Sequence, residues 1–326
     1  MYTVIGKRAS SILYSWLTSN QIQREVIIPA NICESVPATY LKAGCSISFC
    51  DIDHAFCLPW DVLLALAKEK ENIIIHFNHA YGFLTEKQRL MLYRLKQEYP
   101  GIIIVEDCCL CIPELKYSSL CEDLDMVLFS TGNTKVADIG FGGYGYIHEK
   151  WSYKTAEEVF RQKDKDAFEA HVKESHIKEN QKANMDIFFS HWLDCDSDCD
   201  LENYFALVQS QLQKVLLHKQ KLNNIYAKIP GSLSNEYNTW RYNVFLENAD
   251  YCKRVLFANG LYCSNHYMSL CNGYWSNDVT PYCNYVYKHI LNLFNDFCYT
   301  EEQAIKTEEI LSKIAVGISK EQLWRQ

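Results

Sequence analysis

Short apolar segments alternate with longer amphipathic segments through the first 130 residues of this 326-residue chain. The strand candidates are residues 26–28, 46–50, 73–77, 102–105 and 126–129, and the helix candidates include residues 59–70 and 85–98. Strands that alternate with helices favour a mainly parallel sheet joined by right-handed crossovers. No Gly-x-Gly-x-x-Gly motif follows the first strand, which gives a nicotinamide-binding domain little support. The chain is therefore expected to have an α/β fold with a central sheet flanked by helices.

Two of these strand candidates lead into residues that could do chemistry. The fourth leads to Asp107, and the fifth ends at Ser130, with Lys135 five positions later and a glycine cluster, residues 140–143, beyond it. Open α/β sheets bind ligands at the carboxyl ends of their strands. There a lysine can hold a cofactor aldehyde as a Schiff base, and an aspartate can pair with the pyridinium nitrogen of pyridoxal phosphate (PLP). Either residue alone would more simply be a surface side chain or a helix cap, but together they predict a PLP site.

Segments along almost the whole chain resemble, in the same order, motifs of the DegT/DnrJ/EryC1/StrS family of sugar aminotransferases. Residues 25–30 (EVIIPA), 79–82 (HAYG), 105–107 (VED) and 129–143 (FSTGNTKVADIGFGG) are similar to the family segments EVIVPA, HLYG, IEDAAQ and FSFHPVKHITTGEGG. Weaker matches lie at residues 40–44, 51–53, 205–212, 264–267 and 291–303. The order and spacing of these segments, rather than any one of them, carry the resemblance. It implies the aspartate aminotransferase-like fold of fold-type-I PLP-dependent transferases.

The resemblance and the composition together suggest two domains. A large PLP-binding domain is expected over residues 1–203, of which residues 150–203 are charge-rich. A smaller C-terminal α+β domain is expected over residues 204–326, beginning with a long helix at 204–226 and ending with a helix at 300–314. A strand is predicted at residues 242–246 within it.

By this resemblance, Lys135 would hold the cofactor and act as the acid and base of the proton shift, while Asp107 would keep the pyridinium nitrogen protonated. Ser130 matches a serine that contacts the cofactor phosphate, and Ser10 falls on the threonine of the family's SGT motif. The turn at Ser10 opens a predicted helix whose amides and dipole suit a phosphate, although a simple helix cap is an equally good interpretation. The predicted cofactor-binding residues are Ala9, Ser10, Cys33, Asp107, Ser130 and Lys135.

Three further residues are weaker candidates for substrate contacts. His79 follows a strand near the expected cofactor, but a hydrogen-bonded structural histidine is at least as good an interpretation. His266 and Tyr267 match a family segment that lies near the substrate.

The sequence also departs from the family pattern. The family's N-terminal arm is expected to be missing, because residues 2–5 match the strand just before the SGT motif. Cys33 stands where the family places an aromatic ring over the cofactor, Leu110 replaces a glutamine, and Gly132 replaces a histidine. The family's NYRMSE segment is not recognisable at residues 194–203. These departures leave open which substrate the protein uses and whether it turns that substrate over.

The resemblance implies an aminotransferase that moves an amino group from L-glutamate to a keto sugar, expected to be nucleotide-linked, in polysaccharide or amino-sugar biosynthesis. Family dehydratases have histidine in place of the lysine, so Lys135 favours transamination. A homodimer is expected, since fold-type-I enzymes usually place their sites at a dimer interface. The alternatives are a catalytically degenerate ligand-binding or regulatory protein, and a PLP enzyme with a non-sugar substrate.

Composition excludes several other classes of function. A net charge of −8 and a pI near 5.7 argue against nucleic-acid binding. No apolar run approaches the roughly 20 residues of a membrane span, and residues 1–20 do not form a signal peptide. A cytoplasmic protein with reduced thiols is therefore the expected reading of the fifteen cysteines.

No metal site is expected. The segment Cys108-Cys109-Leu110-Cys111 lacks a second Cys-x-x-Cys at zinc spacing and is interpreted as packing behind Asp107. The acidic residues 194–200 fail the calcium-loop pattern, because Cys199 and Phe205 occupy its glycine and glutamate positions.

Overall fold

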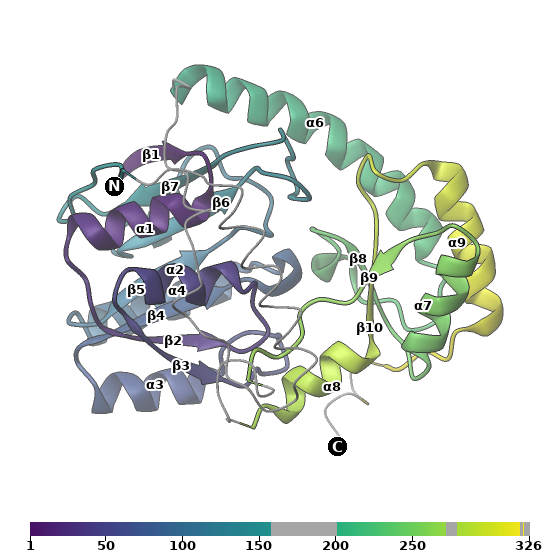
Figure 1. Ribbon diagram of the computed structural model, residues 1–326, viewed down its shortest axis with the longest axis horizontal. Helices are drawn as coiled ribbons and strands as arrows, with labels where there is room; N and C mark the ends of the chain where they lie inside the picture. Colours follow the sequence, from purple (N-terminus) through teal and green to yellow (C-terminus); the bar gives the residue numbers. More distant parts are fainter. Residues whose placement is uncertain (158–200, 272–278, 320–321, 323–326) are drawn as a thin grey trace.

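The computed structural model describes residues 1–157, 201–271, 279–319 and 322. A seven-stranded sheet lies in the N-terminal part of the chain and a three-stranded sheet in the C-terminal part (Figure 1). Most of the charge-rich region at 150–203, including the acidic residues 194–200, lies outside the described residues. The division into domains at residue 203 stays a prediction.

The seven-stranded sheet is parallel except for β7, which runs antiparallel to both of its neighbours. Its order is β1-β7-β6-β5-β4-β2-β3. The strands are β1 (Tyr2–Gly6), β2 (Glu25–Pro29), β3 (Ser46–Cys50), β4 (Ile73–Asn78), β5 (Ile103–Asp107), β6 (Met126–Ser130) and β7 (Gly143–Ile147). The mainly parallel sheet predicted from the alternating pattern is thereby confirmed, and the glycine-rich β7 is an addition that the apolar runs did not indicate.

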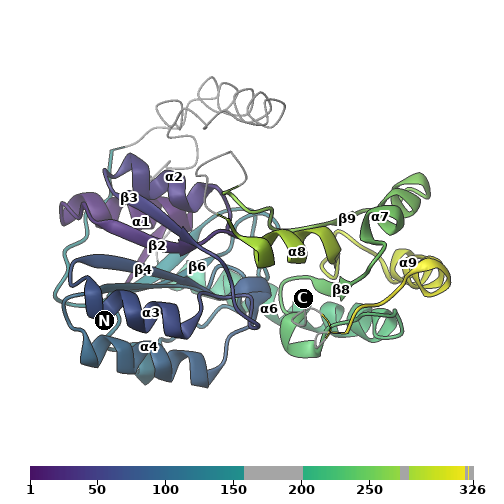
Figure 2. The same ribbon diagram turned by 90° about the horizontal axis from the view of Figure 1, so that it is seen from below.

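Helices cover both faces of this sheet, as Figure 2 shows. They are α1 (Ala9–Ser19), α2 (Ser35–Lys42), α3 (Trp60–Glu69) and α4 (Glu86–Glu98). Successive side chains of a strand point to opposite faces. Along β2, Val26 and Ile28 pack in one core cluster with Trp16 of α1. Ile27 belongs to the other cluster, with Leu92 of α4. Both faces of the sheet are therefore buried. This explains why the central strands are apolar throughout, instead of alternating between apolar and polar residues.

Polar side chains fix where two of the predicted helices begin. The Thr85 hydroxyl accepts a hydrogen bond from the Gln88 amide at 3.2 Å, and the Gln88 side chain accepts one from the Thr85 amide at 2.9 Å. Thr300 and Gln303 form the same reciprocal pair at the start of α9 (Glu301–Ile314). Each pair satisfies two backbone donors that a helix leaves unpaired.

The three-stranded sheet is antiparallel, with the order β8-β10-β9. Its strands are β8 (Tyr242–Phe245), β9 (Cys263–Ser264) and β10 (Ile290–Leu293), and the helices around it are α6 (Leu201–Tyr226), α7 (Ala249–Ala258), α8 (Pro281–His289) and α9. The long helix α6 runs from the seven-stranded sheet to the three-stranded one (Figure 1). Tyr204 and Val208 near its start pack with the first sheet, and Leu222 and Tyr226 near its end pack with the second.

Within the described residues, no helix combines the length and the apolar composition that crossing a membrane requires.

Candidate active site

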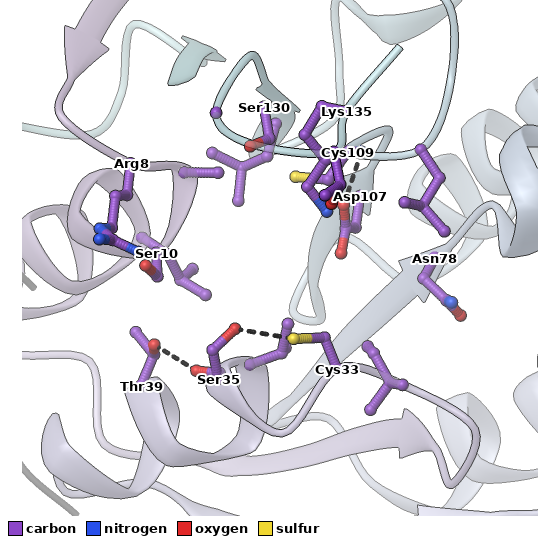
Figure 3. A pocket seen from close by; sticks show the side chains of 18 of the residues that line it. Arg8, Ser10, Cys33, Ser35, Thr39, Asn78, Asp107, Cys109, Ser130 and Lys135 are labelled. Carbon is purple, nitrogen blue, oxygen red and sulfur yellow. Dashed lines mark hydrogen bonds between the residues drawn. The ribbon is translucent and has the colours of Figure 1, made fainter. Parts of the chain in front are cut away.

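A cavity of about 780 Å³ opens at the carboxyl ends of β4, β5 and β6, next to the start of α1. All nine residues that the sequence analysis singled out line it. They are Ala9, Ser10, Cys33, His79, Asp107, Ser130, Lys135, His266 and Tyr267. Figure 3 shows how the labelled side chains surround this space. The structure brings these residues together, and their individual roles stay predictions.

Lys135 lies on a loop that the protein holds from several sides. The Thr134 amide donates to Asp138 at 2.7 Å, the Gly140 amide donates to the other oxygen of Asp138 at 2.8 Å, and the Trp240 ring nitrogen donates to the Thr134 carbonyl at 2.6 Å. The Lys135 side chain is half-buried, and its amine forms no hydrogen bond or ion pair with another described residue. The backbone of the loop is thus held in place, while the Lys135 amine has no partner among the described residues and could react with a ligand.

The glycine cluster behind this loop allows a close backbone approach. A Cβ atom on Gly143 would lie 2.6 Å from the backbone nitrogen of Ala9, closer than real Cβ contacts come. Glycine at this position therefore lets β7 run against the start of α1, which brings Ser10 to the same end of the cavity as Ser130.

Asp107 ends β5 and is almost fully buried, with an exposed fraction of 8%. Its carboxylate accepts hydrogen bonds from the His76 ring nitrogen Nε2 at 3.1 Å and from the Cys109 amide at 2.8 Å. Burial by itself would raise the pKa of Asp107, but the hydrogen bond and charge of His76, together with the Cys109 amide, lower it to about 2. Asp107 is therefore a carboxylate at neutral pH.

His76 is itself oriented by Tyr40, whose hydroxyl lies 3.0 Å from the His76 Nδ1 atom. A carboxylate only accepts hydrogen bonds, so Nε2 carries the hydrogen that is donated to Asp107, and Nδ1 is left to bond the Tyr40 hydroxyl. The sequence analysis missed both residues. A histidine inside the apolar run of residues 73–77 was the available signal, because a buried polar side chain needs a partner.

His79 also lines the cavity, but both of its ring nitrogens are occupied. Nε2 lies 2.8 Å from Glu106, and Nδ1 lies 3.2 Å from the Phe83 carbonyl. Burial would lower the pKa of His79, but Cys108 and the Glu106 carboxylate raise it to about 10. This geometry favours the structural histidine over the substrate contact.

The side chains of His79, Glu106 and Cys108 place possible metal-ligand atoms within 4.8 Å of one another. The Arg89 guanidinium already donates to the same Glu106 oxygen at 3.0 Å and lies 3.8 Å from the Cys108 sulfur. A second cation beside Arg89 would be repelled. The arrangement is therefore better described as a buried ion-pair network.

The end of the cavity near α1 has the features of an oxyanion site. Ser10 and Ser130 border it, and the first residues of α1, Ala9 and Ser10, line it, so the positive end of the helix dipole lies there. Arg8, which precedes the helix, places a guanidinium beside Ser10 (Figure 3). This charge was not anticipated, because the family motif has a serine at that position.

The opposite wall comes from the C-terminal part of the chain. Trp240 lies with its ring centroid 5.5 Å from His266 and stacks in parallel on Tyr267 at 6.2 Å. The Tyr81 hydroxyl donates to the His266 carbonyl at 2.8 Å. Burial lowers the pKa of His266 to about 4, and the cations Arg241, Lys135 and Lys253 contribute, so its imidazole is neutral at neutral pH.

Two thiols face each other across the middle of the cavity. Cys33 lies 3.2 Å from the Ser35 hydroxyl on one side, and Cys109 follows Asp107 on the other (Figure 3).

Comparison with known proteins identifies the fold. No protein-family model and no curated protein matches the sequence. Among solved structures, a DegT DnrJ EryC1 StrS aminotransferase from Brucella abortus matches with a TM-score of 0.64 and 15% identity, over 96% of this chain and 86% of its own. DesI, solved with its TDP-sugar product, matches with a TM-score of 0.67 and 15% identity, over 96% of this chain and 80% of its own. Spr1654 from Streptococcus pneumoniae in its PLP form matches with a TM-score of 0.64 and 15% identity, over 95% and 87%.

The chain therefore has the fold of the fold-type-I PLP-dependent aminotransferases. Within that class, its similarity is to sugar aminotransferases of the DegT/DnrJ/EryC1/StrS type, over almost the whole chain. The fold expected from the sequence motifs is confirmed.

Proposed function

We propose that this chain is a PLP-dependent aminotransferase that moves an amino group from L-glutamate to a nucleotide-linked keto sugar. The observation that carries the proposal is the convergence of three groups in one cavity: the available Lys135 amine, the ionised Asp107 and the helix end beside Ser10. PLP has an aldehyde, a pyridinium nitrogen and a phosphate, and these groups match the three in chemistry.

The residues present fit this cofactor. The Asp107 carboxylate is buried, and a protonated ring nitrogen is a partner that such a charge needs. The start of α1 carries the positive end of the helix dipole and lies next to the Arg8 guanidinium, which suits a phosphate dianion. Similar structures support the assignment, because Spr1654 has been solved in PLP and PMP forms and DesI with its TDP-sugar product.

Bound PLP would supply an aldehyde for amines and a ring that accepts the electron pair of a broken bond. Lys135 Nζ would carry the covalent bond to that aldehyde and, once displaced by the donor amine, would take and return the proton at the donor's Cα. Asp107 would keep the proton on the ring nitrogen, and His76 would keep Asp107 ionised and oriented. Trp240 and Tyr267 would shield the reacting atoms from water on the side of the three-stranded sheet.

We further propose that the protein acts as a cytoplasmic homodimer in polysaccharide or amino-sugar biosynthesis. The thirteen cysteines of the described residues are free thiols, which suits a reducing compartment.

A ligand-binding protein of the same fold without turnover is the second candidate, and Cys33 favours it. A thiol covers much less of a ring face than the aromatic side chain that the family has at this position.

The absorption spectrum of the purified protein with PLP, before and after L-glutamate, tests the proposal. A visible band of bound PLP that bleaches with glutamate would support the aminotransferase. A band that glutamate leaves unchanged would favour the ligand-binding protein or another amino donor, and the absence of any band would refute the cofactor assignment.

Borohydride reduction followed by peptide mass spectrometry tests the lysine. We expect PLP to be fixed to the peptide that contains Lys135, to be lost in Lys135→Ala, and to be kept in the control Lys116→Ala, which changes an exposed lysine. Label on another lysine would refute the role of Lys135.

A further inference from the structure

Lys219 is a lysine in the interior of the C-terminal part of the chain. It lies on α6 with an exposed fraction of 4%, and its amine donates to two acceptors from other segments. These are the Trp240 carbonyl at 2.8 Å and the side-chain oxygen of Asn295 at 2.6 Å. A buried lysine is normally paired with a carboxylate, but Lys219 forms no ion pair with a carboxylate of the described residues. This burial without a counter-charge requires an explanation.

The number of acceptors around the amine suits its neutral form. A neutral amine has two N–H groups, and Lys219 has two acceptors among the described residues. An ammonium group has three N–H groups, so one of them would remain unpaired in the interior. An unpaired buried donor costs free energy, and here that donor would carry a positive charge.

The charges around Lys219 favour the neutral form as well. Arg241, which follows Trp240 in the chain, is 3% exposed, and a guanidinium keeps its proton in proteins. The Asp296 carboxylate acts on both cations, but it accepts the Cys298 amide at 3.0 Å and forms an ion pair with neither. Lys219, Arg241 and Asp296 thus form a buried charge cluster with two cations and one carboxylate. Lys219 is the cation of this cluster that is able to give up its proton.

The pKa of Lys219 agrees with this geometry. Burial lowers the pKa, Asp296 partly offsets that effect, and Arg241 lowers the pKa further, so that it lies at about 7. Cys298 and Tyr299 are neutral at this pH, since burial raises the pKa of both. His218, the preceding residue of α6, lies with Nε2 2.9 Å from the Tyr299 carbonyl and 3.1 Å from the Asp296 carbonyl. The Lys219 amine therefore changes its charge near neutral pH.

The two acceptors of Lys219 connect it to the loop that carries the predicted cofactor lysine. The Trp240 ring nitrogen donates to the Thr134 carbonyl at 2.6 Å, directly before that lysine in the chain. The Asn295 amide donates to the Asn238 carbonyl at 3.1 Å, two residues before Trp240. Lys219 therefore holds residues 238–240 directly and through Asn295, and this segment in turn holds the loop.

We propose that Lys219 is a pH-sensitive switch for the position of the loop that carries Lys135. As a neutral amine it holds Trp240 against the loop, and when it takes up a proton it withdraws from the charge cluster and releases Trp240. An ammonium group beside the Arg241 guanidinium is repelled and lacks a third acceptor, so the charged form gains free energy by moving toward water. The proposal rests on the proposed function only in its consequence that PLP binds more weakly at low pH.

NMR spectroscopy of the full-length protein without cofactor tests the switch directly. With lysine side chains labelled with ¹³C at Cε, the Lys219 signal is the one that Lys219→Gln lacks. We expect its titration midpoint near pH 7, well below the value of about 10.4 that is ordinary for lysine. The indole N–H signal of Trp240, identified by Trp240→Phe, should shift with the same midpoint.

Two glutamine variants of α6 separate the switch from other titrating groups. Lys219→Gln keeps an N–H donor but takes up no proton, so the Trp240 signal should lose its shift near pH 7. The matched control Lys214→Gln, which changes an exposed lysine of the same helix, should keep that shift. His218 is present in both variants. A shift of the Trp240 signal that persists in Lys219→Gln would therefore belong to another group and would overturn the proposal.

The affinity for PLP, measured by spectroscopic titration at pH 6 and pH 8, is the second readout. With a pKa of about 7, about a tenth of the amine is neutral at pH 6. Release of the loop should then weaken binding by up to about tenfold relative to pH 8, beyond any change that Lys219→Gln shows. Lys214→Gln should behave like the unmodified protein.

The outcomes separate this proposal from the proposed function. A Lys219 midpoint near pH 10, or PLP affinities with the same pH dependence in the unmodified protein and Lys219→Gln, would overturn the switch. Should Lys219→Gln fail to fold, Asp296→Asn provides the comparison. It removes the carboxylate that favours the charged amine, so the Lys219 and Trp240 midpoints should move together to lower pH. The absence of PLP binding at every pH, with both signals titrating together, would refute the proposed function alone.

Discussion

At the scale of single residues, one chain of hydrogen bonds decides the charge at the centre of the cavity. The Tyr40 hydroxyl forms a hydrogen bond with His76, and His76 donates to Asp107, with none of the three more than 8% exposed. Burial works against an ionised Asp107, and the donors aimed at its oxygens reverse that effect and lower its pKa to about 2. A buried carboxylate that stays ionised is the partner that a protonated pyridine nitrogen requires.

His76→Phe should therefore weaken catalysis without emptying the site. Asp107 would keep only the Cys109 amide, so burial would raise its pKa and favour the neutral acid. We expect kcat/KM to fall by about tenfold or more, because a hydrogen bond to a charged group is lost. The acid limb of the pH profile of kcat/KM should move to higher pH. Tyr40→Phe, which leaves the imidazole in place, should have a smaller effect. An unshifted acid limb in His76→Phe would contradict the role of His76.

At the scale of elements, a buried ion network joins the turn after β4, the end of β5 and helix α4. His79 and Arg89 both donate to the Glu106 carboxylate, and Arg89 reaches Glu114 at 2.8 Å as well. The network spans three separate elements behind the cavity, and it explains why His79 is charged although it is buried.

The stability that His79 contributes should depend on pH. Its pKa in the folded protein, about 10, exceeds the unfolded value of about 6.5. The contribution is therefore complete below about pH 6.5 and is lost as the pH rises toward 10. Urea unfolding at pH 7 and pH 10 should show the gap in unfolding free energy between the native sequence and His79→Gln shrinking by more than about 1 kcal/mol.

The exposed His54 provides the matched control. His54→Gln should differ from the native sequence by the same small amount at both pH values. A gap for His79→Gln that does not change between pH 7 and pH 10 would show that His79 is not charged in the folded protein.

At the scale of the whole molecule, the loop that carries Lys135 is held by the part of the chain that contains the three-stranded sheet. Trp240 donates from its ring to the Thr134 carbonyl, and Lys219 of α6 donates to the Trp240 carbonyl at 2.8 Å. Lys219 is 4% exposed and also bonds Asn295, so Trp240 is anchored from behind. The position of Lys135 thus depends on contacts made more than one hundred residues later in the chain.

Trp240→Phe should loosen this connection. The substitution keeps an aromatic ring and removes one hydrogen bond, which contributes about 1 kcal/mol. We expect the affinity for PLP, measured by spectroscopic titration, to fall about fivefold, with little change for the control Trp60→Phe on α3. Equal PLP affinity in the two variants would show that the Thr134 contact does not position the loop.

Sequence patterns predicted those features that depend on neighbouring residues. Apolar runs located the five parallel strands from β2 to β6 within a residue or two, and threonines marked the starts of α4 and α9. The expectation of parallel strands also placed Asp107 and Ser130 at the same edge of the sheet, where the strands end. β7 was missed because its glycines and tyrosines do not form an apolar run.

Partners from distant segments were not predictable in the same way. His76 was visible as a polar residue in an apolar strand, but its partner Tyr40 comes from another element, 36 residues earlier. The sequence has no local pattern that marks Arg8 or Trp240 as residues of the cavity. Their roles depend on which segments meet in space, and no local spacing records that.

The sequence by itself determined the α/β alternation, the buried strands and the positions of Asp107 and Lys135 at strand ends, because side-chain periodicity and strand-end chemistry are local properties. Only the tertiary structure decided that His76 donates to Asp107 and that His79 belongs to a buried ion network. Those outcomes depend on burial and on contacts between distant segments, which exist only once the chain has folded.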